Sequence, residues 1–205
     1  AEAARSAADA RPPMTEREVI EWVYRVGGRI NQRGVDPLCV PLPTPADVPD
    51  RGRNLEVFFA GNEIVVDDDL PRLKGLPGLT YLHLVGTRVT DEGMKHVAKL
   101  PGLQSLSLSR TRVGDTGLKY LQNCQTLRSI YLDGTAVTDD GLDYLAAMPQ
   151  SLGQIALKDT AVTDQGIAKL LASQDAFGSI WLNGPHISDA SAELLGRLST
   201  LKTLG

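Results

Sequence analysis

Six aspartates recur at intervals of 24 or 25 residues, and they are the residues in this chain best suited to chemistry. They stand at Asp67, Asp91, Asp115, Asp139, Asp164 and Asp189. Carboxylates in register could hold a calcium ion or serve as catalytic acids and bases. The residue before each of the last five is of a type favoured at helix N-caps, and an acidic group in the first turn complements the helix dipole. Capping accounts for the whole row, so we predict a structural role for it.

A row of threonines precedes the aspartates, at Thr87, Thr111, Thr135 and Thr160. Such a row could bind a phosphate or an ion, but no acidic or glycine-rich loop accompanies it on the same face. In turns stacked on identical turns, a hydroxyl can satisfy backbone groups that stacking would otherwise bury. We therefore predict that the threonines form a structural ladder.

Other reactive constellations are not found in the sequence. The histidines, His83, His96 and His186, lack the spacing of zinc ligands. The glycines are expected to lie in turns and form no phosphate-binding loop after a strand, and no serine lies in a G-x-S-x-G motif. We expect no catalytic residue, no metal ligand and no cofactor, so the chain is predicted not to be an enzyme.

The elements that position these rows are visible in one segment, from Leu79 to Leu100. Apolar residues alternate around Leu82 and Leu84 and then recur in helical three-residue steps after Asp91, which predicts a short strand followed by a short helix. The unit recurs with first apolar residues at Leu55, Leu79, Leu103, Leu127, Leu152, Phe177 and Leu201. This regular recurrence predicts a repeat array in which each unit packs on its neighbours.

Three parts are expected along the chain. Residues 1–13 are alanine-rich and end in two prolines, which favours a disordered lead-in. Residues 14–54 are predicted to form an N-terminal cap, and residues 55–205 about six repeats and a partial seventh. A last strand over Leu201–Gly205 would present an unpaired edge, which could mediate self-association.

The predicted cap consists of a helix and a crossover. Thr15 and Glu18 form a capping box at the start of the helix, and Gly27-Gly28 should end it. Five prolines between residues 36 and 50 disfavour regular helix and central strand and predict an extended connection.

Composition excludes several classes of protein. The net charge of -4 and pI near 5.4 argue against a basic surface for nucleic acid. No apolar run approaches the ~20 residues that span a bilayer. Cys39 and Cys124 lie far apart, and Cys124 occupies the repeat position of Leu100 and Met148, which predicts a buried thiol. The chain starts without a methionine or an apolar signal region, so localisation stays unknown.

The outward positions of the strands are where recognition would occur. The central row is predicted to consist of Phe59, His83, Ser107, Tyr131, Ala156 and Trp181. The repeat does not require aromatic residues there, and exposed aromatics are enriched at binding hot spots. We predict partner binding through Phe59, Tyr81, His83, Tyr131, Asp133, Lys158 and Trp181. The alternative is that strand-compatible residues simply fill an exposed sheet.

The full pattern, L-x-x-L-x-L-x-x-T-x-V-T-D-x-G-L-x-x-L-x-x-L, resembles the leucine-rich repeat family over residues 55–204. It looks most like bacterial proteins whose repeats carry TxVTDxGL, related to the cysteine-containing and ribonuclease-inhibitor-like classes. Pro185 and Ser191 depart from the motif. The resemblance implies an α/β fold: a right-handed solenoid with parallel strands on its concave face and short helices on its convex face. It also implies protein-protein interaction and brings no catalytic residues.

We therefore expect a non-enzymatic module that binds a protein partner on its concave face. Two alternatives stay open. One is a structural segment that self-associates through Leu201–Gly205. The other is a small-ligand site, such as a glycan stacked on Tyr131 and Trp181.

Overall fold

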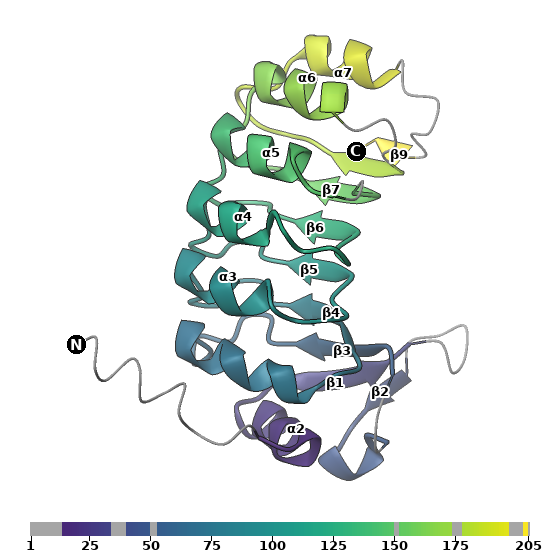
Figure 1. Cartoon of the computed structure of the whole chain (residues 1–205). Helices are drawn as coiled ribbons and strands as arrows, with labels where there is room; N and C mark the ends of the chain where they lie inside the picture. The colour runs from purple at the N-terminus through teal and green to yellow at the C-terminus, as the bar shows by residue number, and fades with distance from the viewer. Residues whose placement is uncertain are drawn as a thin grey trace, which may run out of the picture.

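The computed structural model describes residues 14–33, 40–49, 53–149, 152–173, 178–196 and 203–204 of the 205-residue chain. The predicted lead-in over residues 1–13 lies outside the described residues. Figure 1 shows a curved stack with the strands on its concave side and the helices on its convex side. This arrangement confirms the predicted α/β solenoid.

One nine-stranded sheet runs through the whole stack in the order β2-β1-β3-β4-β5-β6-β7-β8-β9. Strand β1 pairs antiparallel with both β2 and β3, and all pairings from β3 to β9 are parallel. The strands are β1 (Arg29–Gln32), β2 (Val40–Leu42), β3 (Leu55–Phe58), β4 (Leu79–His83), β5 (Ser105–Ser107), β6 (Ser129–Tyr131), β7 (Gln154–Ala156), β8 (Ser179–Trp181) and β9 (Thr203–Leu204). The predicted cap and the predicted array therefore share a sheet.

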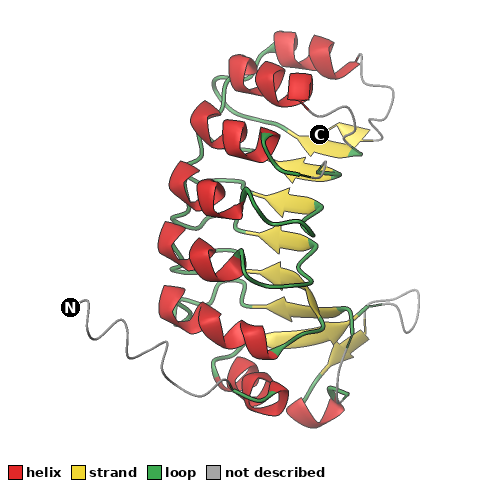
Figure 2. Ribbon diagram, viewed as in Figure 1, coloured by secondary structure: helices red, strands yellow, loops and turns green. Residues whose placement is uncertain are grey.

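A helix follows most strands and returns the chain along the convex side, as Figure 2 shows. The α-helices are α2 (Glu16–Arg25), α3 (Asp91–Val97), α4 (Asp115–Leu121), α5 (Asp139–Ala146), α6 (Asp164–Ser173) and α7 (Asp189–Gly196). The first repeat has instead a 3-10 helix, η2 (Asp67–Gly75), which contains Pro71. Proline removes an amide donor from the helix interior, which is consistent with the irregular helix in this unit.

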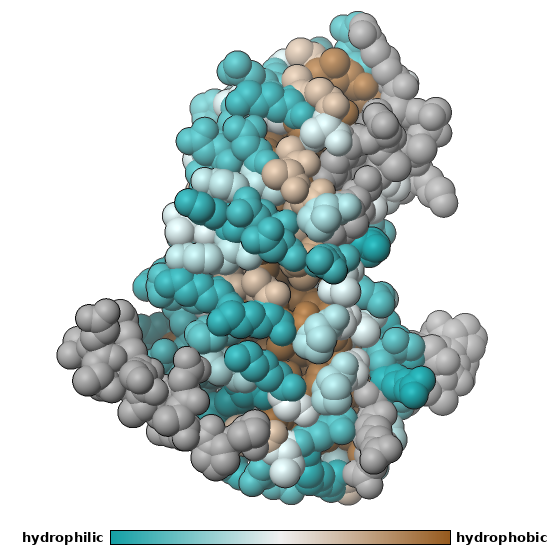
Figure 3. All heavy atoms as spheres, in the orientation of Figure 1, coloured by the Kyte–Doolittle hydropathy of each residue, from teal (hydrophilic) through white to brown (hydrophobic). Residues whose placement is uncertain are grey.

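The core lies between the sheet and the helices as one continuous cluster of buried side chains. Inward strand residues such as Leu106 and Ile130 are fully buried, and helix residues such as Met94 and Leu118 meet them from the other side. Cys124 is buried in the same cluster, as predicted. Figure 3 shows hydrophilic residues over much of the helical side, with hydrophobic residues visible between them. Each repeat thus buries its leucines mainly against its neighbours.

The aspartate row links consecutive repeats. The Asp139 carboxylate accepts hydrogen bonds from the Thr163 backbone N–H at 2.8 Å and from its hydroxyl at 2.7 Å. The same forward bonding joins Asp67 to Thr90, Asp91 to Gly114, Asp115 to Thr138 and Asp164 to Ser188. The role is structural, as predicted, but the carboxylate of each of these five aspartates bonds the N-cap residue of the next unit.

The glycine of the TDxG motif makes space for that carboxylate. A Cβ atom on Gly141 would lie 2.3 Å from Asp115 Oδ1, and one on Gly166 would lie 2.1 Å from Asp139 Oδ1. Both distances are well inside van der Waals contact. In the last full unit the motif glycine is replaced by Ser191, whose hydroxyl donates to Asp164 Oδ1 at 2.6 Å. The departure at Ser191 therefore retains the link between repeats in another form.

The threonine row bonds within its own turn. Thr87, Thr111, Thr135 and Thr160 each donate from the hydroxyl to the carbonyl three residues earlier, at 2.6 to 2.8 Å. All four side chains are buried. The predicted structural ladder is confirmed, with each bond made inside a single repeat.

The N-terminal helix matches its prediction, whereas the crossover differs. Both bonds of the capping box between Thr15 and Glu18 are present, and Gly27 follows the helix with a φ of 81°. Within residues 40–49 the chain forms the short edge strand β2 and the 3-10 turn η1 (Pro45–Asp47). Proline is tolerated at a sheet edge because the unused amide position faces solvent.

The prediction that Phe59 points outward is wrong. Leu55 pairs with Leu79, but the next pair is Glu56 with Tyr81, so β4 holds one extra residue, Thr80, at this point. Side chains alternate across a sheet, so a shift of one residue exchanges the two faces. Phe59 is consequently 1% exposed and packs on Trp22 with 5.5 Å between ring centroids.

Candidate functional site on the concave face

The outward residues of β3 to β8 form the candidate site. Pairing places Phe58 beside His83, Ser107 beside Tyr131, and Ala156 beside Trp181, so Phe58 takes the place that Phe59 was predicted to hold. The remaining predicted residues, Tyr81, His83, Tyr131, Asp133, Lys158 and Trp181, are partly exposed. The aromatic residues and His83 separate into two clusters, one at each end of the face, and Asp133 and Lys158 belong to neither.

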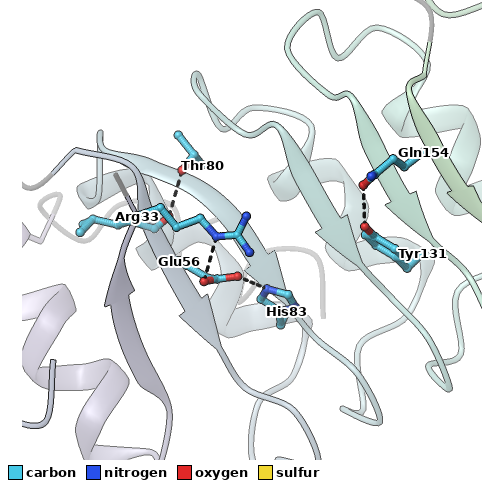
Figure 4. Close-up of polar contacts among 7 residues, drawn as sticks. Arg33, Glu56, Thr80, His83, Tyr131 and Gln154 are labelled. Carbon is cyan, nitrogen blue, oxygen red and sulfur yellow. Dashed lines mark hydrogen bonds and ion pairs between the residues drawn. The ribbon is translucent and has the colours of Figure 1, made fainter. Parts of the chain in front are cut away.

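The first cluster surrounds a buried carboxylate, that of Glu56. This residue is 2% exposed, and its carboxylate lies 2.8 Å from His83 Nε2 and 3.2 Å from Arg33 Nε (Figure 4). An ionised carboxylate only accepts, so His83 donates from Nε2. The His83 ring also stacks on Phe58, with 4.3 Å between centroids and 4° between planes. A buried carboxylate with two such partners holds both side chains in place.

Arg33 extends from the end of β1 across this cluster. Its guanidinium carbon lies 4.1 Å from the centroid of the Tyr81 ring, in cation-π geometry. Burial by itself would lower the pKa of Arg33, but the hydrogen bond and charge of Glu56, together with Tyr81, raise it above the ordinary value. Arg33 therefore stays charged and is fixed over the Tyr81 ring.

The second cluster is built on Tyr131 and Trp181. Their ring centroids are 6.1 Å apart although β7 lies between them, because the intervening residue is the small Ala156. The Tyr131 hydroxyl donates to Gln154 Oε1 at 2.8 Å (Figure 4), and the Ser129 hydroxyl approaches the same oxygen at 3.1 Å. Burial raises the pKa of Tyr131, and the charge of Arg33 lowers it in part.

A polar strip on β5 separates the clusters. His83 bonds Glu56 and Tyr131 bonds Gln154, so both rings are held by partners on the side away from β5. Ser105 and Ser107 lie between them and are 7% and 6% exposed. Neither hydroxyl makes a hydrogen bond to any part of the chain that the structure describes. These are nearly buried polar groups that remain available to a ligand.

Asp133 and Lys158 lie just past the carboxyl ends of β6 and β7 and play a partly structural role. Asp133 Oδ1 accepts the Lys158 backbone N–H at 2.9 Å, and Oδ2 lies 3.5 Å from the Ser109 hydroxyl. The Lys158 ammonium makes no ion pair with the described residues. Only Lys158 of this pair therefore has a charged group free to meet a partner.

Sequence reasoning missed Arg33, Glu56 and Phe58. Arg33 lies in the predicted cap, outside the repeat pattern, and the other two were assigned the wrong face by the one-residue shift. No sequence signal marks that shift, since the spacing of 24 residues from Leu55 to Leu79 is regular. Their association depends on β1 joining the sheet beside β3.

The described residues contain no group of three His, Cys, Asp or Glu side chains that could hold a metal ion. The same part of the chain has no helix long and apolar enough to cross a membrane.

Comparisons with solved structures found similar chains at low identity. Leiomodin-1 Actin-Binding Site 2 has a TM-score of 0.48 at 14% identity, over 70% of this chain and 77% of that one. Internalin C2 from Listeria monocytogenes str. 4b F2365 has a TM-score of 0.49 at 19% identity, over 92% of both chains. Another internalin from the same strain has a TM-score of 0.42 at 23% identity, over 66% of this chain and 50% of that one.

The comparison with curated proteins found no significant match. The family described as Leucine Rich repeat matches three consecutive units, residues 77–98, 100–121 and 123–146. Those units contain the strands β4 to β6 and the helices α3 to α5, in which the leucines, the threonine ladder and the forward-bonding aspartates are most regular. The sequence match and the observed architecture agree, and these three units are leucine-rich repeats.

Proposed function

We propose that the concave face binds a protein partner. Leucine-rich repeats generally mediate protein-protein interaction, which is the general expectation for this chain. The surface in question carries Phe58, Tyr81, His83, Tyr131, Asp133, Lys158 and Trp181. No catalytic step is part of the proposal.

The observation that carries the proposal is the Tyr131–Trp181 pair. Both rings remain partly exposed although they touch each other and although Gln154 orients Tyr131. Folding of the repeat needs neither ring, because the equivalent residues on β5 and β7 are Ser107 and Ala156. Rigid aromatic side chains that are held in place lose little entropy on binding, which is why they form hot spots.

The dimensions of the face suit an extended segment. Six strands, β3 to β8, are separated by five intervals of about 4.8 Å, which gives about 24 Å. An extended peptide of about seven residues covers that length. A segment of this size could reach both clusters at once.

The test replaces Tyr131 and Trp181 together by serine and compares capture of partners from a lysate. The matched control replaces Tyr120 and Tyr144 by serine, because these partly exposed tyrosines lie on the convex helices α4 and α5. We expect the concave variant to lose the proteins that the wild type and the control retain. Equal capture by all three proteins would contradict the proposal.

A second candidate function is self-association through the last strand. In the described part of the chain β9 has β8 as its only neighbour in the sheet, and its other edge is open to pairing. Sedimentation at several protein concentrations tests this candidate. A strictly monomeric particle over the whole range would rule it out.

A further inference from the structure

We propose that the partner of the concave face presents a carboxylate side chain to Arg33 and an aromatic or aliphatic side chain, about four residues away, to the Tyr131–Trp181 pair. The proposal rests on the proposed function and specifies the chemistry of the partner. It concerns an acidic, extended segment of a protein.

The donor set around Arg33 is the first argument. Glu56 engages Nε, and Tyr81 takes a further side-chain hydrogen bond from Arg33, so most of the five N–H donors of the guanidinium have no partner among the described residues. The side chain is 46% exposed and cannot swing away, because Tyr81 lies beneath it and Glu56 holds it. A planar fork of donors that is already immobilised suits a bidentate carboxylate.

The serines of β5 supply the second argument. Ser105 pairs in the sheet with Tyr81, whose ring lies beneath Arg33. Ser107 pairs with His83, the next outward residue on the same strand. Both residues are nearly buried, and their hydroxyls have no hydrogen-bond partner among the described residues. A hydroxyl without a partner, on the strand next to the one that carries Tyr81, can donate to an anion bound at Arg33.

The acidic groups of the face do not compete for this place. Glu56 is committed to His83 and Arg33, and Asp133 lies past the carboxyl end of β6, where it accepts the Lys158 backbone N–H. Glu56 offsets part of the charge of Arg33, so the gain from a bound carboxylate comes mainly from directed hydrogen bonds. The expected effect of losing them is therefore about tenfold in affinity.

The distance between the clusters gives the spacing in the partner. Tyr81 on β4 and Ala156 on β7 are three strands apart, or about 14 Å. An extended chain advances about 3.4 Å per residue, so four residues cover that distance. Residues i and i+4 of a strand also point to the same side, so both side chains can face the sheet.

The experiment selects binders from a random 12-residue peptide library displayed on phage. Four proteins are compared: the wild type, Arg33→Gln, Tyr131→Ser with Trp181→Ser, and the control Arg88→Gln. Arg88 is an exposed arginine in the loop between β4 and α3. We expect the wild type and the control to enrich peptides with Asp or Glu and, three to five positions away, an aromatic or aliphatic residue.

Each variant should change one half of that pattern. Arg33→Gln should lose the acidic preference and bind the selected peptides about tenfold more weakly, while keeping the apolar preference. The double serine variant should keep the acidic preference and lose the apolar one. Raising the salt from about 0.05 to 0.5 M should weaken wild-type binding by less than that factor, because salt screens only the remaining charge of Arg33, and should leave Arg33→Gln almost unchanged.

Removal of Arg33 could disturb the fold because it leaves Glu56 with one fewer partner. Thermal melting of Arg33→Gln checks this, and Arg33→Lys provides a second variant that keeps the charge but not the planar fork. We expect Arg33→Lys to retain only part of the acidic preference.

The outcomes separate the two proposals. If no peptide is enriched on the wild type, the carboxylate anchor and the binding of extended segments are both overturned. If enriched peptides depend on Tyr131 and Trp181 but show no acidic preference, or keep it on Arg33→Gln, the anchor is overturned and the proposed function stands.

Discussion

The replacement of Gly141 by alanine measures how strongly consecutive repeats are linked. A Cβ atom here would lie 2.3 Å from Asp115 Oδ1 and 3.1 Å from both the Leu118 and Val137 side chains. The carboxylate would have to move by about 1 Å, a shift that breaks its bonds of 2.9 and 2.8 Å to the N–H and hydroxyl of Thr138. For half-buried bonds to a charged group this loss is about 2–3 kcal/mol.

Helix propensity acts in the opposite direction. Alanine in a helix interior is favoured over glycine by about 1 kcal/mol. The balance predicts that Gly141→Ala lowers the free energy of unfolding by about 1–2 kcal/mol. Propensity alone would predict stabilisation, so the sign of the effect decides between the two explanations.

A double-mutant cycle isolates the contact. In an Asp115→Ala background the carboxylate is gone, and Gly141→Ala should be neutral or stabilise by up to about 1 kcal/mol. Urea unfolding of the four proteins at pH 7, followed by circular dichroism at 222 nm, gives the coupling free energy, which we expect to be about 2 kcal/mol. A coupling below about 0.5 kcal/mol, or a stabilising Gly141→Ala in the wild-type background, would refute the reasoning.

Three further predictions concern stability. Hydrogen bonds, of which the one from the Ser188 side chain has the largest effect, lower the pKa of Asp164 from 3.8 to about 2. The stability that the ionised Asp164 carboxylate provides should be complete above pH 3.8 and lost as the pH falls to about 2. The urea midpoints of the wild type and Asp164→Ala should therefore converge near pH 2. Gly86 has a φ of 65°, so Gly86→Ala should lower the free energy of unfolding by about 1 kcal/mol, whereas Gly102→Ala, at ordinary φ, should not. Leu106 is fully buried, so Leu106→Ala should cost about 2–5 kcal/mol in urea unfolding.

Much of the fold could be predicted because the same pattern of apolar and capping residues occurs in several repeats. The strand leucines, the capping box at Thr15 and the buried thiol of Cys124 all lie where local pattern places them. The aspartate row shows the limit of that approach. Its residue type indicates capping, but only the stacked structure shows that Asp139 bonds Thr163 in the next unit.

The candidate site was less predictable. Tyr131 and Trp181 were found because regular repeats keep their register, and their alternation therefore assigns them to the outer face. Phe59 was misplaced because one extra residue in β4, Thr80, changes the register only after the first pair. Such a shift does not change the 24-residue spacing of the leucines, so the sequence gives no sign of it.

The sequence by itself determined the repeat period, the alternation of strand and helix, and the outward position of Tyr131 and Trp181. These properties follow from local spacing that recurs unit after unit. The tertiary structure decided which face Phe58 and Phe59 occupy and brought Arg33 to Glu56 and His83. The physical reason is that pairing between strands joins residues that are more than twenty positions apart, and the carboxylate of Glu56 finds its two partners only when β1, β3 and β4 lie side by side.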